Sequence, residues 1–185
     1  MPASVDQLLD LLDLDQVDDC VYQGRQPETA LQRVFGGQVA GQALVAAART
    51  ADPARSVHSL HAYFLRPGDT RVPIHYDVER IRDGRSFSTR RVVGRQRDTA
   101  IFYMSASFQV HEDGLTHQDP MPQTVPPNDS PELGDVLARL TGRPREDWDR
   151  EWAALEFRHA GDSRPGGALH DPAHPAVART WLRSA

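Results

Sequence analysis

The chain has 185 residues, of which 39% are hydrophobic and 25% are charged, and its formal net charge at pH 7 is −5. This length suits one domain or slightly more. The negative balance argues against nucleic acid or an anionic membrane surface as a partner. All 21 basic residues are arginine. Any phosphate contact would therefore come from arginine, histidine or backbone amides.

Cysteine usage and the N-terminal residues bear on the cellular setting. Cys20 is the only cysteine, which excludes an intrachain disulfide and favours a reducing cytoplasm. Its acidic neighbours Asp18 and Asp19 disfavour a thiolate nucleophile. The first residues lack the basic and apolar regions of a signal peptide, and no segment approaches the roughly 20 apolar residues of a membrane-spanning helix. We expect a cytoplasmic protein without membrane attachment.

The first third of the chain predicts two helices and a short strand. Residues 4–14 have the pattern of an amphipathic helix with Ser4 as its N-cap, and residues 20–24 read as a strand. A helix is expected over 37–50, where nearly every residue is small or apolar. A helix that is apolar all round is a buried helix, so other elements should enclose it.

Four strand-like segments follow, over residues 57–65, 74–82, 86–95 and 100–110. The second alternates apolar and polar residues, which gives one wet face, and Asp83-Gly84 after it marks a tight hairpin. The alternating apolar residues of the fourth indicate core or interface. A buried helix followed by an antiparallel meander indicates an α+β arrangement with a sheet curled around the helix.

The remainder of the chain reads as a linker and a short final segment. Residues 114–131 hold five prolines and few large apolar residues. Short helices are expected over 131–140 and 145–152, the second with Trp148 and Trp152 on one face, and a loop over 162–175. We therefore expect an N-terminal domain (1–113), a linker with short helices (114–153) and a final segment (154–185).

Several long motifs, in a fixed order, carry a resemblance to a known family. They are FGGQ (35–38), VHSLHAYFLRPGD (57–69), YDVERIRDGRSFSTRR (76–91) and IFYMSASFQ (101–109). They resemble the acyl-CoA thioesterase II family, which has a double hotdog fold. The resemblance is strong through about residue 123 and resumes from 155 to 185. It implies a complete N-terminal hotdog domain and a partial second hotdog repeat beginning near residue 154.

The resemblance implies hydrolysis of acyl-CoA to free fatty acid and CoA, without a metal or a covalent cofactor. The family's catalytic Asp, Ser or Thr, and Gln lie in the second repeat, and their motifs find no match here. We therefore assign no catalytic residue to this chain. The alternative is a non-catalytic N-terminal half, truncated or part of a split enzyme, that binds acyl-CoA or a partner chain.

The expected contribution to a substrate pocket comes from Phe35, Gly36, Gly37, Gln38 and His58. A Gly-Gly pair at a helix start offers backbone N–H groups and the positive end of the helix dipole, which suit a thioester carbonyl as it becomes an oxyanion. In the alternative interpretation the glycines only let the helix pack against a strand. For Gln38, a bond to substrate and a cap on its own helix stay equally open.

Other polar residues give weaker signals. The odd separation of His58 and His61 on one strand predicts opposite faces, with a structural or pocket-edge role for His58 and a structural one for His61. No histidine or cysteine spacing indicates a metal site. Arg90 and Arg91 could meet CoA phosphates, or be one solvated and one salt-bridged residue.

Assembly is expected because a single hotdog sheet ends in an open edge. We place that edge at the strand over 100–110 or at its neighbour. Four large aromatic residues also need burial: Trp148, Trp152, Phe157 and Trp181. The predicted partners are acyl-CoA and either a second copy of the chain or a chain that carries the second hotdog repeat.

Overall fold

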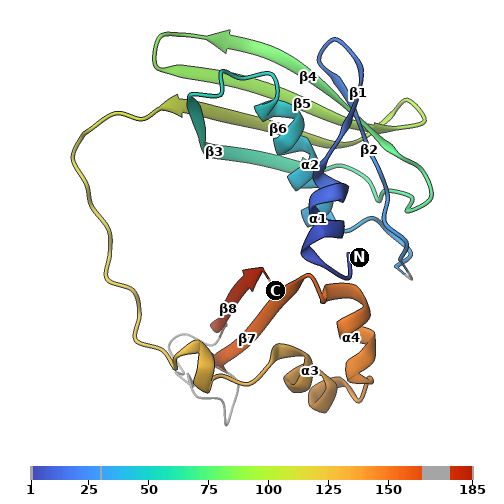
Figure 1. Cartoon of the computed structure of the whole chain (residues 1–185), viewed down its shortest axis with the longest axis vertical. Coiled ribbons are helices and arrows are strands. Elements are labelled where there is room, and N and C mark those ends of the chain that lie inside the picture. Colours follow the sequence, from blue (N-terminus) through green and yellow to red (C-terminus); the bar gives the residue numbers. More distant parts are fainter. Residues whose placement is uncertain (1, 30, 164–175, 185) are drawn as a thin grey trace. The chain divides into compact units, whose positions relative to one another are not determined.

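The computed structural model describes residues 2–29, 31–163 and 176–184, so nearly all of the loop expected over 162–175 lies outside the described residues. The chain divides into two compact units. We call residues 9–115 the sheet unit, and the described residues up to 8 and from 116 onward the C-terminal unit. The elements up to the end of the sheet unit (Figure 1) are α1 (Val5–Leu12), β1 (Asp15–Asp18), β2 (Val21–Gly24), α2 (Gly36–Ala48), β3 (Arg55–Phe64), β4 (Ile74–Asp83), β5 (Phe87–Gln96) and β6 (Thr99–Val110).

The sheet unit is an antiparallel sheet of six strands in the order β1-β2-β4-β5-β6-β3, and α2 lies against one face of it (Figure 1). The helix and the four strands expected after it are confirmed, each to within two residues at either end. The strand β1 was not expected, because its four residues are all exposed and show no alternation. β6 lies between β5 and β3, so the edge strand on this side of the sheet is β3, its neighbour, and the other edge strand is β1.

The core forms where α2 meets the sheet. Val39, Ala43 and Ala47 recur every four residues and are at most 4% exposed, and they face the buried side of β6, where Phe102, Met104, Ala106 and Phe108 alternate with less buried residues. Alanines let the helix axis approach the sheet closely. The opposite side of the helix differs from the expectation, because Gly37 and Ala48 are exposed. The helix is fully buried along one side only.

A buried amide fixes how α2 is rotated on the sheet. Gln42 is fully buried, and its Nε2 donates to the backbone oxygens of Leu11 (2.8 Å) and Arg25 (3.0 Å). Its Oε1 accepts from the Tyr76 hydroxyl at 2.8 Å, and burial raises the pKa of that hydroxyl. A Cβ on Gly24 would lie 2.4 Å from Oε1 of Gln42, so only glycine fits there.

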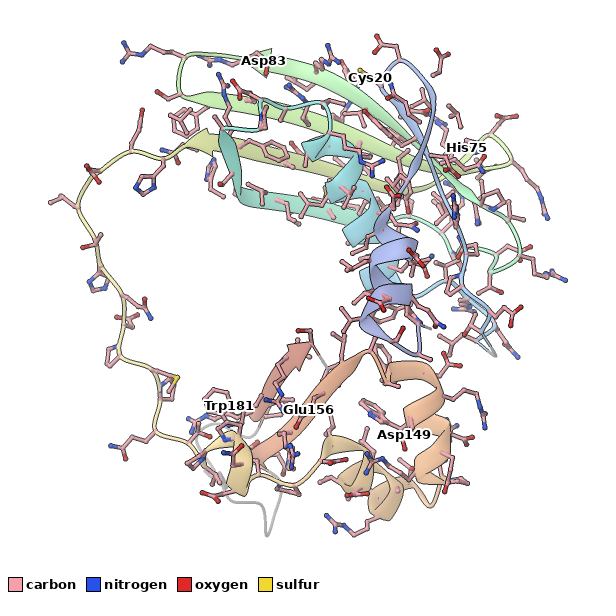
Figure 2. The ribbon with its side chains drawn as sticks, viewed as in Figure 1. Cys20, His75, Asp83, Asp149, Glu156 and Trp181 are labelled. Atoms are coloured by element: carbon pink, nitrogen blue, oxygen red, sulfur yellow. The ribbon has the colours of Figure 1, made fainter. Side chains whose placement is uncertain are left out.

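A buried guanidinium holds the other end of α2. Arg90 is 1% exposed; it donates to the Thr50 carbonyl and hydroxyl oxygens, both at 2.8 Å, and to Asp83 at the end of β4, also at 2.8 Å (Figure 2). Arg91 is exposed and pairs with Glu79. The proposed CoA-phosphate role for this pair is therefore wrong for Arg90, whose donors are all directed inward. The alternative of one solvated and one salt-bridged residue is also wrong, because both arginines are ion-paired and Arg90 is buried.

The C-terminal unit contains η1 (Pro127–Asp129), α3 (Leu133–Thr141), α4 (Arg145–Trp152), β7 (Leu155–Asp162) and β8 (Ala178–Ser184). The two expected helices are confirmed. Trp148 and Trp152 stack at 5.6 Å between ring centroids, and both meet Phe157 of β7 edge-on. This contact joins α4 to β7, which pairs with β8 in a two-stranded sheet.

Ion pairs complete the C-terminal unit. Arg145 at the start of α4 contacts three carboxylates, which raises the pKa of its guanidinium: Asp149, Asp135 and Glu132. On the two-stranded sheet, Glu156 accepts from Arg158 (2.6 Å) and Arg183 (2.5 Å), and Trp181 donates its indole N–H to the backbone oxygen of Val125 at 2.8 Å (Figure 2).

We expect Ala43→Leu or Ala47→Leu to overpack the contact between α2 and the sheet and to lower the free energy of unfolding by about 1–3 kcal/mol. Both alanines are fully buried. Chemical denaturation followed by circular dichroism measures the change. The matched control is Ala48→Leu, at an exposed position of the same helix. Equal stability of all three variants would show that this side of α2 is not tightly packed.

Candidate functional site

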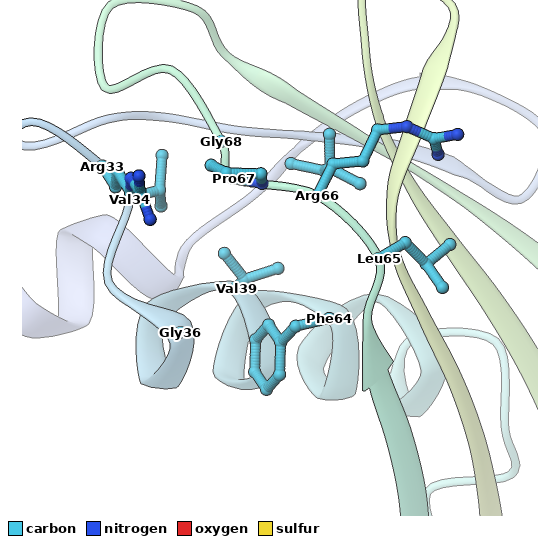
Figure 3. A pocket seen from close by; sticks show the side chains of 10 residues that line it. Arg33, Val34, Gly36, Val39, Phe64, Leu65, Arg66, Pro67 and Gly68 are labelled. Atoms are coloured by element: carbon cyan, nitrogen blue, oxygen red, sulfur yellow. The ribbon is translucent and has the colours of Figure 1, made fainter.

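A hollow of about 340 Å³ lies beside the first turns of α2 (Figure 3). Besides the first turns of α2, three segments of the sheet unit contribute to it: the chain that leads into α2, the end of β3 with the turn that follows, and the start of β6. The lining residues are Arg33, Val34, Gly36, Val39, Phe64, Leu65, Arg66, Pro67, Gly68 and Ile101.

Backbone hydrogen bonds bring these segments together. The Val34 N–H donates to the Gly68 oxygen at 3.1 Å, and the Leu65 N–H donates to the Ile101 oxygen at 2.8 Å. A Cβ on Gly68 would lie 3.0 Å from Cγ2 of Val34 and 3.2 Å from Cδ1 of Ile101, so a larger residue here would require these side chains to shift by a few tenths of an ångström. The Arg66-Pro-Gly-Asp turn is thus one wall of the hollow.

Each of the two glycines that start α2 lies under an aromatic ring. A Cβ on Gly36 would be 3.1 Å from the Phe64 ring, and one on Gly37 would be 2.4 Å from the Phe35 ring. The first intrahelical bond runs from the Val39 N–H to the Phe35 oxygen (3.3 Å). The amides before Val39 therefore have no acceptor within the helix. Both interpretations of the glycine pair stand, because it permits close packing and presents free donors.

Gln38 bonds to the segment that precedes α2. It is 6% exposed, and its Nε2 donates to the Arg25 oxygen (3.3 Å) and to Oε1 of Gln26 (3.0 Å). The helix start has no side-chain cap, so the capping alternative is wrong. Of the five residues expected in the pocket wall, only Gly36 lines this hollow; Phe35 lies on Gly37, and Gln38 tethers the segment before the helix.

His58 lies elsewhere on the sheet. It is exposed, bonds through Nε2 to Ser107 Oγ at 2.8 Å and meets Phe87 edge-on. It is six residues from Phe64 along β3, about 20 Å in an extended strand. The structure therefore does not bring His58 to the hollow.

The expectation that His58 and His61 lie on opposite faces is wrong. The pairing of β3 with β6 shifts register between Val57 and Ser59, so His58 is the extra residue of a β-bulge. His61 pairs with Ser105, and Ser105 shares a face with Ser107, which His58 contacts. The extra residue changes the parity of the strand, and both imidazoles lie on the face opposite α2.

The chemistry of the hollow is apolar with two cations. Arg66 donates to the Ala100 oxygen at 2.8 Å, and Arg33 forms no ion pair or hydrogen bond with another of the described residues. None of the lining residues carries a carboxylate, imidazole, hydroxyl or thiol group. The hollow can therefore hold an apolar chain and meet a negative charge, but its lining supplies no general base.

Two further features, a metal site and a membrane-spanning helix, were looked for in the described residues. Within residues 2–29, 31–163 and 176–184, no three His, Cys, Asp or Glu side chains are grouped to bind a metal ion, and no helix is long and apolar enough to cross a membrane. Desolvation and a hydrogen bond with Asp19 raise the pKa of the Cys20 thiol, as its acidic neighbours led us to expect.

The sheet and helix define an α+β hotdog domain. A structure from Alicyclobacillus acidocaldarius, a conserved protein of unknown function with a hotdog fold, superposes with a TM-score of 0.72 over 95% of this chain and 61% of that chain at 20% identity. This likeness shows the fold. Residues 25–109 match the acyl-CoA thioesterase N-terminal domain.

Named relatives show the same similarity. The chain is 41% identical over 184 residues to acyl-CoA thioesterase 2 of Haemophilus influenzae. The matched region covers 100% of this chain and 64% of that protein. It is 50% identical over 123 residues to mouse acyl-coenzyme A thioesterase 8, covering 64% of this chain and 38% of that protein. The acyl-CoA thioesterase II TesB2 of Mycobacterium marinum superposes with a TM-score of 0.73 at 41% identity, over 95% of this chain and 59% of that chain. The chain is therefore related to the acyl-CoA thioesterases along its whole length, and it spans less than two thirds of the length of these relatives.

We expect Phe64→Ala to weaken binding of a fluorescent fatty acid several-fold, because the ring forms one wall of the hollow. The ring is 61% exposed, so stability should fall by only about 0.5–1.5 kcal/mol, the worth of its pairing with Phe102. Fluorescence titration measures the affinity. The control is Phe87→Ala, an exposed phenylalanine that does not line the hollow; an equal loss in both variants would contradict the assignment.

Proposed function

We propose that this chain is the N-terminal part of an acyl-CoA thioesterase, and that its hollow beside α2 binds the acyl chain of the substrate. The observation that carries the proposal is an apolar hollow beside the first turn of a helix, within the segment that matches the acyl-CoA thioesterase N-terminal domain. The relatives' names support the reaction, which is hydrolysis of acyl-CoA to free fatty acid and CoA.

The geometry suggests how the chain would contribute. The acyl chain would lie against Val39, Phe64 and Ile101, and the thioester carbonyl near the free amides at the start of α2. Those amides and the helix dipole favour a developing oxyanion. Water would add to the carbonyl carbon, the C–S bond would then break, and CoA would leave as its thiol. Arg33 is the cation placed to meet a phosphate group of CoA.

The second candidate is a binding half without catalytic activity of its own. One observation favours it: the lining of the hollow carries no carboxylate, imidazole or hydroxyl group. A water nucleophile at neutral pH needs a general base. We propose that the base belongs to the second hotdog repeat, of which the segment 154–185 would be the beginning, and that 114–153 serves as the linker.

We expect the 185-residue chain alone to hydrolyse acyl-CoA at least about 10²-fold more slowly than a full-length relative such as the Haemophilus influenzae protein, because a missing general base costs that much or more. A thioesterase assay on palmitoyl-CoA measures this, with the intact mass of the preparation determined beside it. Rapid turnover by the verified chain would place the catalytic groups within these residues, and Gln38 and His58 would be the first to substitute.

The edge strand β3 supports a proposal about assembly. Leu60, Tyr63 and Phe64 are 48–61% exposed on a strand that pairs on one side only. Exposed apolar residues on an open edge favour pairing with another chain. We propose that β3 pairs with a second copy or with a chain that carries the second hotdog repeat. A cytoplasmic location and a place in fatty-acid metabolism complete the proposal; the single cysteine and the family support them.

We expect the chain to self-associate at micromolar concentration and Tyr63→Lys to shift it toward monomer, because a lysine on an edge strand opposes pairing. Sedimentation velocity gives the distribution of species. Ile81→Lys is the matched control, since Ile81 is 49% exposed on β4, an inner strand. A wild-type chain that stays monomeric throughout would contradict pairing between copies and leave the partner chain to be tested by co-purification.

A further inference from the structure

The turn that forms one wall of the hollow is bonded to a buried side chain, Gln96, that does not itself line the hollow. We propose that Gln96 is a positioning residue, which fixes the turn after β3 so that Pro67 and Gly68 can line the hollow. The inference rests on the proposed function, because it assigns to Gln96 control over the affinity for the acyl chain.

The side-chain amide of Gln96 bonds to the backbone of the turn as the backbone of a neighbouring strand would. It is the last residue of β5 and is 7% exposed. Its Oε1 accepts from the Asp69 N–H at 2.8 Å, and its Nε2 donates to the Asp69 oxygen at 2.8 Å and to the Val72 oxygen at 2.5 Å. Both N–H donors and the carbonyl of the amide are thus used, and all three bonds reach the backbone of one turn.

Several bonds anchor the turn. At its start, the N–H groups of Leu65 and Arg66 donate to the Ile101 oxygen at 2.8 and 3.2 Å. Its other end has two anchors. The first is the bond from the Val34 N–H to the Gly68 oxygen at 3.1 Å. The second is Gln96 on Asp69 and Val72. The other contacts of Asp69, with Arg71 and Arg97, lie at an exposed surface, where ion pairs hold little. Without Gln96 this end of the turn keeps one backbone bond, from Val34 to Gly68, and the exposed ion pairs of Asp69. Pro67 and Gly68 can then move away from α2, and the hollow loses the shape of one wall.

A purely structural role is the competing explanation, and the chain offers a matched control for it. Gln42 is also a buried amide with two donated bonds and one accepted bond. It lies on the β2 side of α2 and does not line the hollow. If Gln96 acts only through stability, Gln42→Ala and Gln96→Ala should affect ligand binding alike.

The experiment uses the 185-residue chain and hexadecyl-CoA thioether, which cannot be hydrolysed, with CoA as a second probe. Isothermal titration gives the affinities, and denaturation gives the stability of each variant. We expect Gln96→Ala to weaken thioether binding at least tenfold, with little change for CoA. We expect Gln42→Ala to lower stability but to keep the thioether affinity within twofold of wild type.

A second variant gives a readout that stability alone would not produce. Gln96→Glu presents a carboxylate that cannot donate to the two carbonyl oxygens, so it should bind weakly at pH 7.5. Burial raises the pKa of such a carboxyl group, and its protonated form can donate one bond. We expect it to regain part of its affinity toward pH 5.5, measured relative to wild type at each pH because Asp69, Arg71 and Arg97 lie nearby.

The outcomes separate the inference from the function on which it rests. A wild-type chain that does not bind the thioether overturns the proposed function and the role of Gln96 with it. Wild-type binding that Gln96→Ala leaves unchanged overturns the positioning role alone. An equal loss in Gln42→Ala, or a Gln96→Glu affinity that does not respond to pH, also overturns it.

Discussion

The close contact between the small side chains of α2 and the buried face of the sheet determines where everything else in the sheet unit lies. Alanines at every fourth position leave no bulk to hold the helix away from β6. Once the helix is this near, its N-terminus falls beside the end of β3, and the segments around positions 34 and 68 can bond to each other. The hollow is a consequence of that approach, because larger residues on α2 would separate its walls.

The alanines of α2 set its distance from the sheet but do not set its orientation on the sheet. Three buried polar side chains fix that orientation and the turn beside it. Gln42 fixes the helix against the β2 side, Arg90 fixes its C-terminal end, and Gln96 fixes the turn over the hollow. Each satisfies backbone groups that no strand or helix partner reaches. Buried polar groups whose hydrogen bonds are all made favour one arrangement of the helix and turn over its alternatives. A binding site beside a helix of small residues depends on such an arrangement.

The sequence predicted the helix, its neighbouring strands and the family, because periodicity and local motifs carry that information. It did not predict the bulge at His58, because no residue type marks the position of an extra residue in a strand. The extra residue reverses which face of the sheet each earlier residue of β3 lies on. Nor could it show that Gln38 bonds to Gln26, twelve positions away in the chain. The position of the turn after Phe64 beside α2 could not be predicted either, because it depends on long-range pairing.

The packing of Gly24 on Gln42 also bears on how this domain can evolve. A side chain at position 24 would occupy the space of the Gln42 amide, whose oxygen also holds the Tyr76 hydroxyl. Position 24 can therefore enlarge only if position 42 shortens, and a shortened residue there leaves the hydroxyl of Tyr76 without its acceptor. Substitutions at the three positions are therefore coupled. We expect the positions to covary among homologous sequences, although they lie on β2, α2 and β4.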